Sequence, residues 1–371
     1  MAGLYFHIPF CVQACNYCDF HFSTQLGTRG KMVDAMIAEI ERSQDLWGEE
    51  CFETLYFGGG TPSVLSDEEL ARLAEAAMKL GAWNLKEWTL EANPEDLSRE
   101  RLEGLAALGV TRLSIGIQSL DEKTLSWMNR AHSVEQARNA VADAASIGFQ
   151  HISVDMIYGV PGLSLGDFKS QLQEVLAWPI DHLSSYILTA EPRTAYGHSI
   201  AKGLISEAPS EVIAQQYAAL CSASQAAGFS HYETSNFSRP GGEGLHNSRY
   251  WAGSAYLGIG PGAHSFKGRE RWWNIANNPR YIREGACTER ETLTARDRFN
   301  EIIMTGLRTL KGLDAGALKH ETGIELVSQP AFSRYIDQDW LVEENGRIWL
   351  RPEHWLVGDA VAAALFVVAA E

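Results

Sequence analysis

The sequence predicts an α/β fold: a partial (β/α)6 barrel followed by a small, helical, winged-helix-like α+β domain at the C-terminus. Six short apolar runs alternate with helical patterns over the first two thirds of the 371 residues. This alternation is typical of parallel strands joined by right-handed helical crossovers. Six strands are too few for the closed eight-stranded barrel. Beyond about residue 208 the alternation ends, and the last part of the chain returns to helices with one hairpin.

The six strand candidates are rich in β-branched or aromatic residues. They are Leu4–Ile8, Thr54–Phe57, Trp88–Ala92, Arg112–Ile117, His151–Ile157 and Leu183–Leu188. Five helices are predicted between them, at Met32–Leu46, Ser66–Leu80, Arg99–Leu108, Ser133–Ile147 and Phe168–Leu176. Ser66 stands three residues before Glu69, which indicates a capping box at the start of a helix.

The second half of the chain has a different pattern. A long helix is predicted at Ser210–Ala227, and a stretch rich in glycine and aromatic residues follows from Tyr232 to Trp273. Glu343–Leu350 predicts a small hairpin around Asn345-Gly346, because Asn-Gly favours the two-residue turns of hairpins.

Composition and charge exclude several classes of protein. Hydrophobic residues make up 45% and charged residues 21%, which indicates a globular chain. The net charge of -16 argues against binding to duplex nucleic acid or to anionic membranes. No signal peptide is visible, and the apolar stretch Ala360–Ala370 would form a helix of about 16 Å, half of a bilayer core. We therefore expect a cytoplasmic protein without a transmembrane segment, whose C-terminal helix docks on its own domain.

Three of the six cysteines are clustered. Cys11, Cys15 and Cys18 have C-x3-C-x2-C spacing directly after the first strand, where parallel α/β folds place their chemistry. Three thiolates suit three corners of a [4Fe–4S] cluster, and the fourth iron is then open to a ligand with an amine and a carboxylate. The alternative is a structural zinc site, which needs a fourth ligand such as His7 or His21. The other cysteines have no metal spacing and are expected to be buried thiols: Cys51, Cys221 and Cys287.

With the aromatic Tyr17 before its last cysteine, this loop resembles the signature of the radical S-adenosylmethionine (SAM) superfamily. The segment YFGGGTP (56–62) resembles the glycine motif of that superfamily, which contacts the methionyl amine. The resemblance implies a [4Fe–4S] cluster on the three cysteines and SAM beside Tyr17, Gly59, Gly60 and Thr61. Glycines permit the close backbone approach that a bound ligand needs; a plain Gly-Pro turn is the alternative.

Further positions resemble the family of oxygen-independent coproporphyrinogen III oxidase. They are Tyr5, Glu91, Gln118, Arg130 and Asp155. The resemblance implies that these residues bind SAM: Arg130 suits its carboxylate, and Glu91 or Asp155 suits its amine or ribose hydroxyls. Each alone would be an ordinary charge at a strand end, but together they recur at successive strand ends, where the mouth of a barrel lies.

Two members of this family compete. The oxidase removes carboxyl groups from two propionates of its substrate, and its motif has another cysteine two residues after the third. Phe20 occupies that position here. The oxidase also has an N-terminal extension, whereas ten residues precede Cys11. Both differences argue against a coproporphyrinogen oxidase; we assign no catalytic residues and leave open whether the chain is an enzyme.

The other member is a haem chaperone, marked by the hexad H-N-x-x-Y-W. This chain has it as His246, Asn247, Tyr250 and Trp251, with Arg249 between them. Imidazole is a common axial ligand of haem iron, aromatic rings pack on porphyrins, and Arg249 suits a propionate. A polar aromatic corner with a satisfied histidine is the alternative.

The resemblance thus implies a haem chaperone that binds haem, a [4Fe–4S] cluster and SAM, and passes haem to acceptor haem proteins. The alternatives are the oxidase and another radical enzyme that opens haem to a linear tetrapyrrole. Protein partners suit the acidic surface better than nucleic acid, and a homodimer is left open. We delimit a barrel at residues 1–230, the segment with the haem motif at 231–295, and a C-terminal domain of the oxidase type at 296–371.

Overall fold

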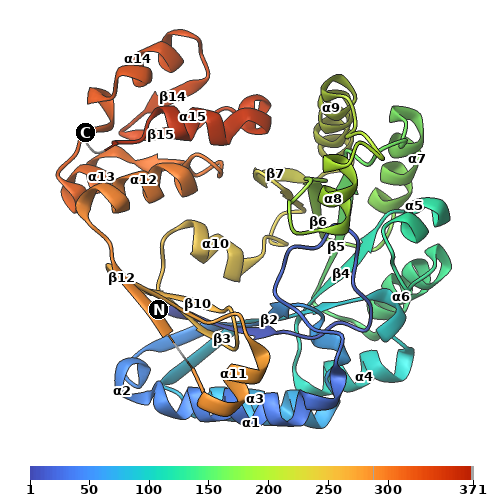
Figure 1. Cartoon of the computed structure of the whole chain (residues 1–371). Coiled ribbons are helices and arrows are strands. Elements are labelled where there is room, and N and C mark those ends of the chain that lie inside the picture. Colours follow the sequence, from blue (N-terminus) through green and yellow to red (C-terminus); the bar gives the residue numbers. More distant parts are fainter. Residues whose placement is uncertain (287, 369–371) are drawn as a thin grey trace.

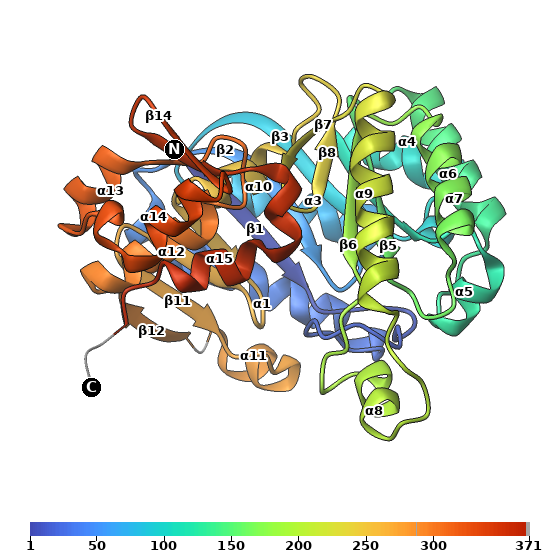
Figure 2. The ribbon, with the colours of Figure 1, turned by 90° about the horizontal axis from the view of Figure 1, so that it is seen from above.

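The computed structural model describes residues 1–286 and 288–368. Its centre is a row of six parallel strands in sequence order, which confirms the predicted partial barrel (Figure 1). The strands are β1 (Ala2–Ile8), β2 (Cys51–Gly59), β3 (Ala82–Ala92), β4 (Arg112–Gln118), β5 (His151–Tyr158) and β6 (His182–Ile187). The sheet is curved, and helices lie along its convex side (Figure 1 and Figure 2).

The outer helices pack against the sheet, and together they form one hydrophobic core. They are α1 (Arg29–Arg42), α3 (Asp67–Met78), α4 (Arg99–Leu108), α6 (Val134–Ile147), α7 (Leu165–Leu176) and α9 (Ser210–Ala226). Side chains alternate along each strand: Trp88 and Leu90 of β3 are buried in this core, whereas Glu87 and Glu91 line cavities of the interior. The inner face of the barrel is therefore polar and available for chemistry.

Local signals in the sequence explain several helix ends. The capping box predicted at Ser66 and Glu69 is present and starts α3. The single helix predicted at Met32–Leu46 is wrong, because it is broken at Ser43, whose hydroxyl donates to the Glu39 carbonyl (2.9 Å); α2 (Gln44–Trp47) follows. Short helices were not predicted at α5 (Glu122–Trp127) and α8 (Ala195–Ala201).

The segment 231–295 extends the sheet at both edges. β8 (Asn236–Ser238) and β7 (Ser230–Glu233) follow β6, whereas β9 (Tyr256–Ile259) pairs in parallel with β1. β10 (His264–Lys267), β11 (Glu270–Asn274) and β12 (Thr288–Thr292) continue that edge to twelve strands. No strands were predicted here, because strands of three to five residues interrupted by glycines give too little periodicity. The same segment contains α10 (Leu245–Trp251), which lies inside the curve of the sheet, and α11 (Asn278–Glu284) (Figure 1).

The C-terminal domain has its own hydrophobic core and the predicted α+β composition. Its elements are α12 (Ala295–Gly306), β13 (Leu313–Asp314), α13 (Ala315–Thr322), α14 (Pro330–Asp337), β14 (Leu341–Glu344), β15 (Arg347–Leu350) and α15 (Gly358–Ala364). The predicted hairpin is β14–β15, and both turn residues have positive φ, 50° at Asn345 and 78° at Gly346, as a type I′ turn requires.

The apolar C-terminal stretch is less helical than predicted. Helix α15 ends at Ala364, not near residue 370, while Val361 and Leu365 pack in the domain core as expected. Residues 369–371 and the predicted thiol of Cys287 lie outside the described residues. Within the described chain, no helix is long and apolar enough to cross a membrane.

Candidate functional site

The three clustered cysteines line one cavity of about 650 Å³ at the carboxyl ends of the barrel strands, here called the mouth cavity. The Thr61 hydroxyl donates to the Cys11 Sγ (3.3 Å), and the Arg130 Nη1 donates to the Cys15 Sγ (3.4 Å). The first contact favours the thiolate of Cys11, since a hydroxyl donor stabilises negative sulfur.

The cysteine loop is fastened to the turn before Arg130. Gln13 donates to the Asn129 backbone and side-chain oxygens (both 2.9 Å), and Asn129 donates back to the Ala14 carbonyl (2.6 Å). Asn16 donates to the Trp127 carbonyl (2.6 Å). Asn129 has a φ of 58°, a left-handed conformation that asparagine tolerates better than most residues. Cysteine loop and arginine are thus held as one unit.

The geometry does not favour a zinc site. His7 is engaged at both ring nitrogens, by the Tyr5 hydroxyl (3.2 Å) and the His21 carbonyl (2.8 Å), and His21 contacts Asn278 (2.7 Å). Neither histidine lines the mouth cavity. In the described part of the chain, no three His, Cys, Asp or Glu side chains are arranged to hold a single metal ion.

Burial opposes the ionisation of two of the three thiols. Burial raises the pKa of Cys11 to about 12, against the hydrogen bond from Thr61, and burial also raises the pKa of Cys18. Metal binding deprotonates such thiols and releases protons. The donor set, with three thiols on one cavity and cationic or hydroxyl donors to two of them, therefore fits an iron–sulfur cluster.

The mouth cavity gathers eight of the nine residues predicted to bind SAM. They are Tyr17, Gly59, Gly60, Thr61, Glu91, Gln118, Arg130 and Asp155. Tyr5 is the exception: it lies deeper in the barrel, with its ring beside Tyr56 and His246 (centroids 5.8 and 6.4 Å apart) and its hydroxyl on His7. Strand alternation explains this position, because Tyr5 lies in the middle of β1 and its ring projects from the inner face.

The glycine turn after β2 is required by close packing. A Cβ on Gly60 would lie 2.6 Å from the Phe10 carbonyl and 2.8 Å from the Ile8 carbonyl. Gly59 has a φ of 107°, which strongly favours glycine, and its amide donates to Glu91 (3.2 Å). This turn lines the cavity and bonds to one of its carboxylates, so it is more than a plain turn.

Two carboxylates in the cavity have raised pKa values. Burial raises the pKa of Glu91 to about 7, and the nearby charge of Asp155 adds to this effect, whereas the Tyr56 hydroxyl, which donates at 2.7 Å, opposes it. Burial likewise raises the pKa of Asp155 to about 6, against hydrogen bonds such as those from Ser114 (3.2 and 3.3 Å). A cationic ligand would therefore stabilise the ionised forms of both carboxylates, because a nearby positive charge lowers the pKa of a carboxylic acid.

Arg130 is held by a partner that the sequence did not reveal. Its Nη2 donates to the Asn93 side chain (2.6 Å) and to the Gly116 carbonyl (2.8 Å). Asn93 in turn donates to Thr61 (3.3 Å), so it joins the arginine to the glycine turn. The sequence feature that could have identified Asn93 is its position two residues after Glu91, at the end of the same strand. Gln118, at the end of β4, has a φ of 59°, a strained backbone of the kind that is often found at functional sites.

Helix α10, which carries the hexad, is held against the inner face of the barrel sheet by contacts with β3 and β4. Glu87 accepts from the backbone amides of Leu245 and His246 (both 2.9 Å) and pairs with Arg112 (2.9 Å). Both charged side chains are almost fully buried. Arg112 also donates to the Gly242 carbonyl (2.9 Å), so a buried ion pair fixes the start of the helix.

The structure splits the hexad between the two sides of α10. The His246 Nδ1 meets the Thr54 hydroxyl (2.8 Å), and its ring lies 4.9 Å from that of Tyr56. Burial lowers the pKa of His246 to about 4, so the ring is neutral at physiological pH. Asn247 lines a small polar cavity inside the barrel. Tyr250 and Trp251 instead line a second large cavity.

Arg249 already has an acidic partner in the barrel sheet. It forms an ion pair with Glu53, which is buried in β2. The expected pairing of Arg249 with a propionate would therefore have to replace this ion pair. Like His246 three residues before it, Arg249 faces the sheet.

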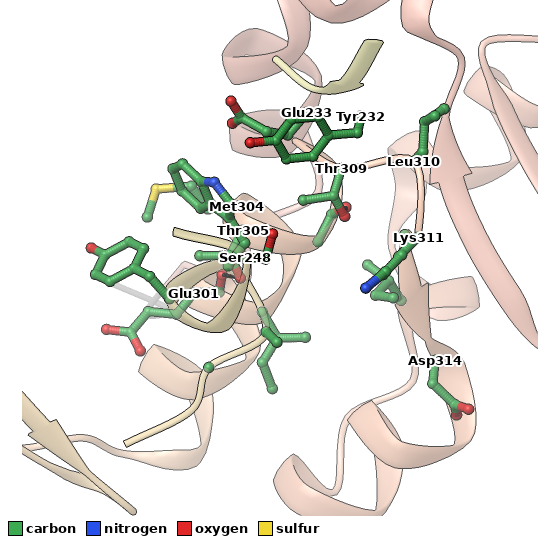
Figure 3. A pocket seen from close by; sticks show the side chains of 18 of the residues that line it. Tyr232, Glu233, Ser248, Glu301, Met304, Thr305, Thr309, Leu310, Lys311 and Asp314 are labelled. Carbon is green, nitrogen blue, oxygen red and sulfur yellow. Dashed lines mark hydrogen bonds between the residues drawn. The ribbon is translucent and has the colours of Figure 1, made fainter. Parts of the chain in front are cut away.

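The second large cavity has a volume of about 990 Å³ and lies between α10 and the C-terminal domain; we call it the interdomain cavity. Figure 3 shows Ser248 of α10 and Glu301, Met304 and Thr305 of α12 on one wall, and Leu310 and Lys311 across from them. It shares no lining residue with the mouth cavity. Sequence patterns did not reveal it, because its walls come from segments distant in the chain.

The partly buried state of two other cysteines corrects a further expectation. Cys51 and Cys221 are free and only partly buried. Cys221 lies 3.8 Å from the His231 ring nitrogen and far in sequence from the clustered thiols.

Comparison with known proteins supports this arrangement. Residues 5–175 match the model of the radical SAM superfamily, and residues 293–357 match the HemN C-terminal domain. The chain is similar in fold to coproporphyrinogen III oxidase (HemN) of Escherichia coli, with a TM-score of 0.85 and 20% identity over 99% of this chain and 90% of that one. At that identity the likeness shows the fold alone.

Proteins with higher sequence identity to this chain than the oxidase are named heme chaperones. The chain is 35% identical to the heme chaperone HemW of Mycobacterium tuberculosis, over 98% of this chain and 94% of that protein. It is 31% identical to heme chaperone HemW of Bacillus subtilis, over 98% and 99% respectively. The radical SAM superfamily implies a [4Fe–4S] cluster and SAM. The chain belongs to the HemW family of the radical SAM superfamily.

Proposed function

We propose that this protein is a haem chaperone, which binds haem together with a [4Fe–4S] cluster and SAM and transfers the haem to acceptor haem proteins. The observation that carries the proposal is the end-to-end similarity to proteins named heme chaperone HemW, at 31–35% identity. The hexad on α10 and the replacement of the fourth oxidase cysteine by Phe20 support the same function.

The mouth cavity is the proposed cofactor site. Cys11, Cys15 and Cys18 hold three irons of the cluster, and the fourth iron is left for SAM. Around SAM, Arg130 pairs with the carboxylate, Glu91 and Asp155 accept from the amine or ribose, and the others shape the pocket: Tyr17, Gly59, Gly60, Thr61 and Gln118. Tyr5 packs with its ring against that of Tyr56. When bound, the cluster and SAM supply one-electron chemistry to the site.

The hexad on α10 is the proposed haem element. Tyr250 and Trp251 line the interdomain cavity, whereas His246 and Asn247 face the barrel on the other side of the helix. A carrier needs a site that holds intact haem apart from reactive chemistry. The interdomain cavity shares no lining residue with the mouth cavity, and this separation suits such a carrier.

Product analysis separates a chaperone from an oxidase. The protein is reconstituted anaerobically with iron and sulfide and incubated with SAM and a reductant, once with coproporphyrinogen III and once with haem. We expect no loss of carboxyl groups and recovery of intact haem in a one-to-one complex with a Soret band. Loss of two carboxyl groups would establish the oxidase, and a linear tetrapyrrole would establish a haem-degrading enzyme.

A further inference from the structure

The small polar cavity inside the barrel, here called the inner polar cavity, has a volume of about 50 Å³ and no role in the proposed function. It is lined by alternate residues of β3, β4, β5 and β6, together with Tyr56 of β2 and Asn247 of α10. Because side chains alternate along a strand, these residues project from the inner face of the sheet. Each side chain that lines the cavity is polar, so it suits water and not an apolar ligand.

Two buried groups that line this cavity lack a hydrogen-bond partner. Arg112 is 3% exposed; its Nε donates to Glu87 (2.9 Å) and its Nη2 to backbone carbonyls, but its Nη1 has no partner among the described residues. The hydroxyl of Thr89, which is 1% exposed, is equally without a partner in the described chain. Buried polar groups of this kind are usually satisfied by ordered water. A water molecule needs roughly 10–15 Å³, so the cavity has room for about three to five.

The inner polar cavity adjoins both larger cavities. The residues that line it and also line the mouth cavity are Glu91, Ser114, Asp155 and Tyr186. At the other end, Glu87 lines both the inner polar cavity and the interdomain cavity. Water in the inner polar cavity would therefore stand between the carboxylates of the mouth cavity and the interdomain cavity.

A buried relay of hydrogen bonds leads from the inner polar cavity to the interdomain cavity. The Ser153 Oγ lies 2.6 Å from the His182 Nδ1, and the His182 Nε2 lies 2.8 Å from the Tyr232 hydroxyl. Ser153 and His182 line the inner polar cavity, whereas Figure 3 shows Tyr232 in the wall of the interdomain cavity. Burial and the charge of Arg112 lower the pKa of His182 to about 3, against the charge of Asp181. The ring is therefore neutral, and a neutral imidazole donates through one nitrogen while it accepts at the other.

The carboxyl groups at the mouth end can supply protons to this relay. Burial raises the pKa of Glu91 to about 7 and that of Asp155 to about 6, so both carry protons part of the time between these pH values. SAM is a sulfonium cation, and a nearby positive charge favours the ionised carboxylates. Binding of SAM would thus expel protons from groups that SAM itself covers on the side of the mouth cavity.

We propose that the inner polar cavity holds ordered water and forms, with Ser153, His182 and Tyr232, a proton path from the mouth cavity to the interdomain cavity. This inference rests on the proposed function, because SAM is the ligand that displaces the proton. A proton from Asp155 passes over water to the Ser153 oxygen, and the Ser153 proton moves to the His182 Nδ1. The Nε2 proton moves to the Tyr232 oxygen, whose own proton leaves to solvent in the interdomain cavity. One proton enters and one leaves, the carboxylate keeps the electron pair, and release of SAM reverses the transfer.

The test measures the release of protons when SAM binds to the reconstituted full-length protein in the absence of reductant. Protein and SAM are mixed by stopped flow in weak buffer between pH 6 and 7, where the pKa values of the two carboxyl groups lie. An indicator dye reports protons, and tryptophan fluorescence reports binding. Tyr232→Phe and Ser153→Ala each remove one hydroxyl of the relay. Tyr217→Phe is the matched control, because its hydroxyl contacts the Pro352 carbonyl (3.5 Å) and Tyr217 does not line the inner polar cavity.

In the wild type and in Tyr217→Phe, we expect proton release to keep pace with SAM binding. In Tyr232→Phe and Ser153→Ala it should lag behind binding by at least about tenfold, because a positioned side chain speeds proton transfer by about 10²–10⁴-fold. A high-resolution crystal structure should show ordered water on the Arg112 Nη1 and the Thr89 hydroxyl.

The inference is overturned by a dry inner polar cavity, by a wild type that binds SAM without releasing protons, or by prompt release in either relay variant. A wild type that binds no SAM would instead refute the proposed cofactor site, and the inference would fall with it. Binding and proton release are recorded separately, so the two failures are distinguished.

Discussion

The buried ion pair that anchors α10 can be tested by removing one charge. Glu87→Gln keeps the shape of the side chain but leaves Arg112, only 3% exposed, without a counter-charge, and weakens the bonds to two backbone amides at 2.9 Å. Removal of one partner from a buried pair costs about 3–5 kcal/mol. Because glutamine still accepts one hydrogen bond, we expect the lower end, about 3 kcal/mol.

The assay is urea unfolding of the full chain, monitored by tryptophan fluorescence, with hydrogen exchange of residues 245–251. Glu174→Gln is the control, since Glu174 forms an exposed ion pair with Arg138 (2.7 Å) in the same barrel. Exposed pairs contribute about 0–1 kcal/mol. Glu87→Gln should therefore lose much more stability than Glu174→Gln and exchange faster in α10. Equal loss in the two variants would refute the anchoring role of Glu87.

Three further predictions concern the mouth cavity. Cys15→Ala should lose the cluster on reconstitution, measured as iron content and visible absorption, while Cys221→Ala should retain about four irons per chain; equal iron in both would contradict the assignment. Gly60→Ala should destabilise the chain by about 1–3 kcal/mol and weaken SAM binding in calorimetry, because its Cβ meets backbone oxygens, whereas Gly27→Ala, with nothing within 4 Å, should do neither. Glu91 has a folded-state pKa of about 7 against an ordinary value of 4.5, so the folded state binds the extra proton between these values. Wild type should therefore lose thermal stability relative to Glu91→Gln as the pH rises from 4.5 to 7, and a pH-independent difference would show that the raised pKa is wrong.

Much of the site could be predicted from the sequence because strand order and strand ends carry the chemistry. In a parallel sheet, residues at the carboxyl ends of successive strands meet at one edge, so Glu91, Gln118 and Asp155 were expected together, and they line one cavity. The capping box at Ser66 and the Asn345-Gly346 turn were local signals that depend on few neighbours.

The rest depends on contacts between distant segments. The pairing of Arg249 with Glu53, and the direction of His246 toward Thr54, result from how α10 lies between sheet and C-terminal domain. No spacing within the hexad encodes which side of the helix faces which partner. The edge strands around β9 were missed for the same reason, because pairing with β1 and not local periodicity makes them strands.

Transfer of intact haem to an acceptor distinguishes a haem chaperone from an enzyme that alters the tetrapyrrole. The reconstituted protein is loaded with haem, freed of excess, and mixed anaerobically with apomyoglobin, with and without SAM, while absorption of the acceptor and mass spectra of the tetrapyrrole are recorded. We expect chemically intact haem to reach the acceptor in stoichiometric amount. Haem that is returned decarboxylated or ring-opened, or a protein that takes up no haem, would contradict it.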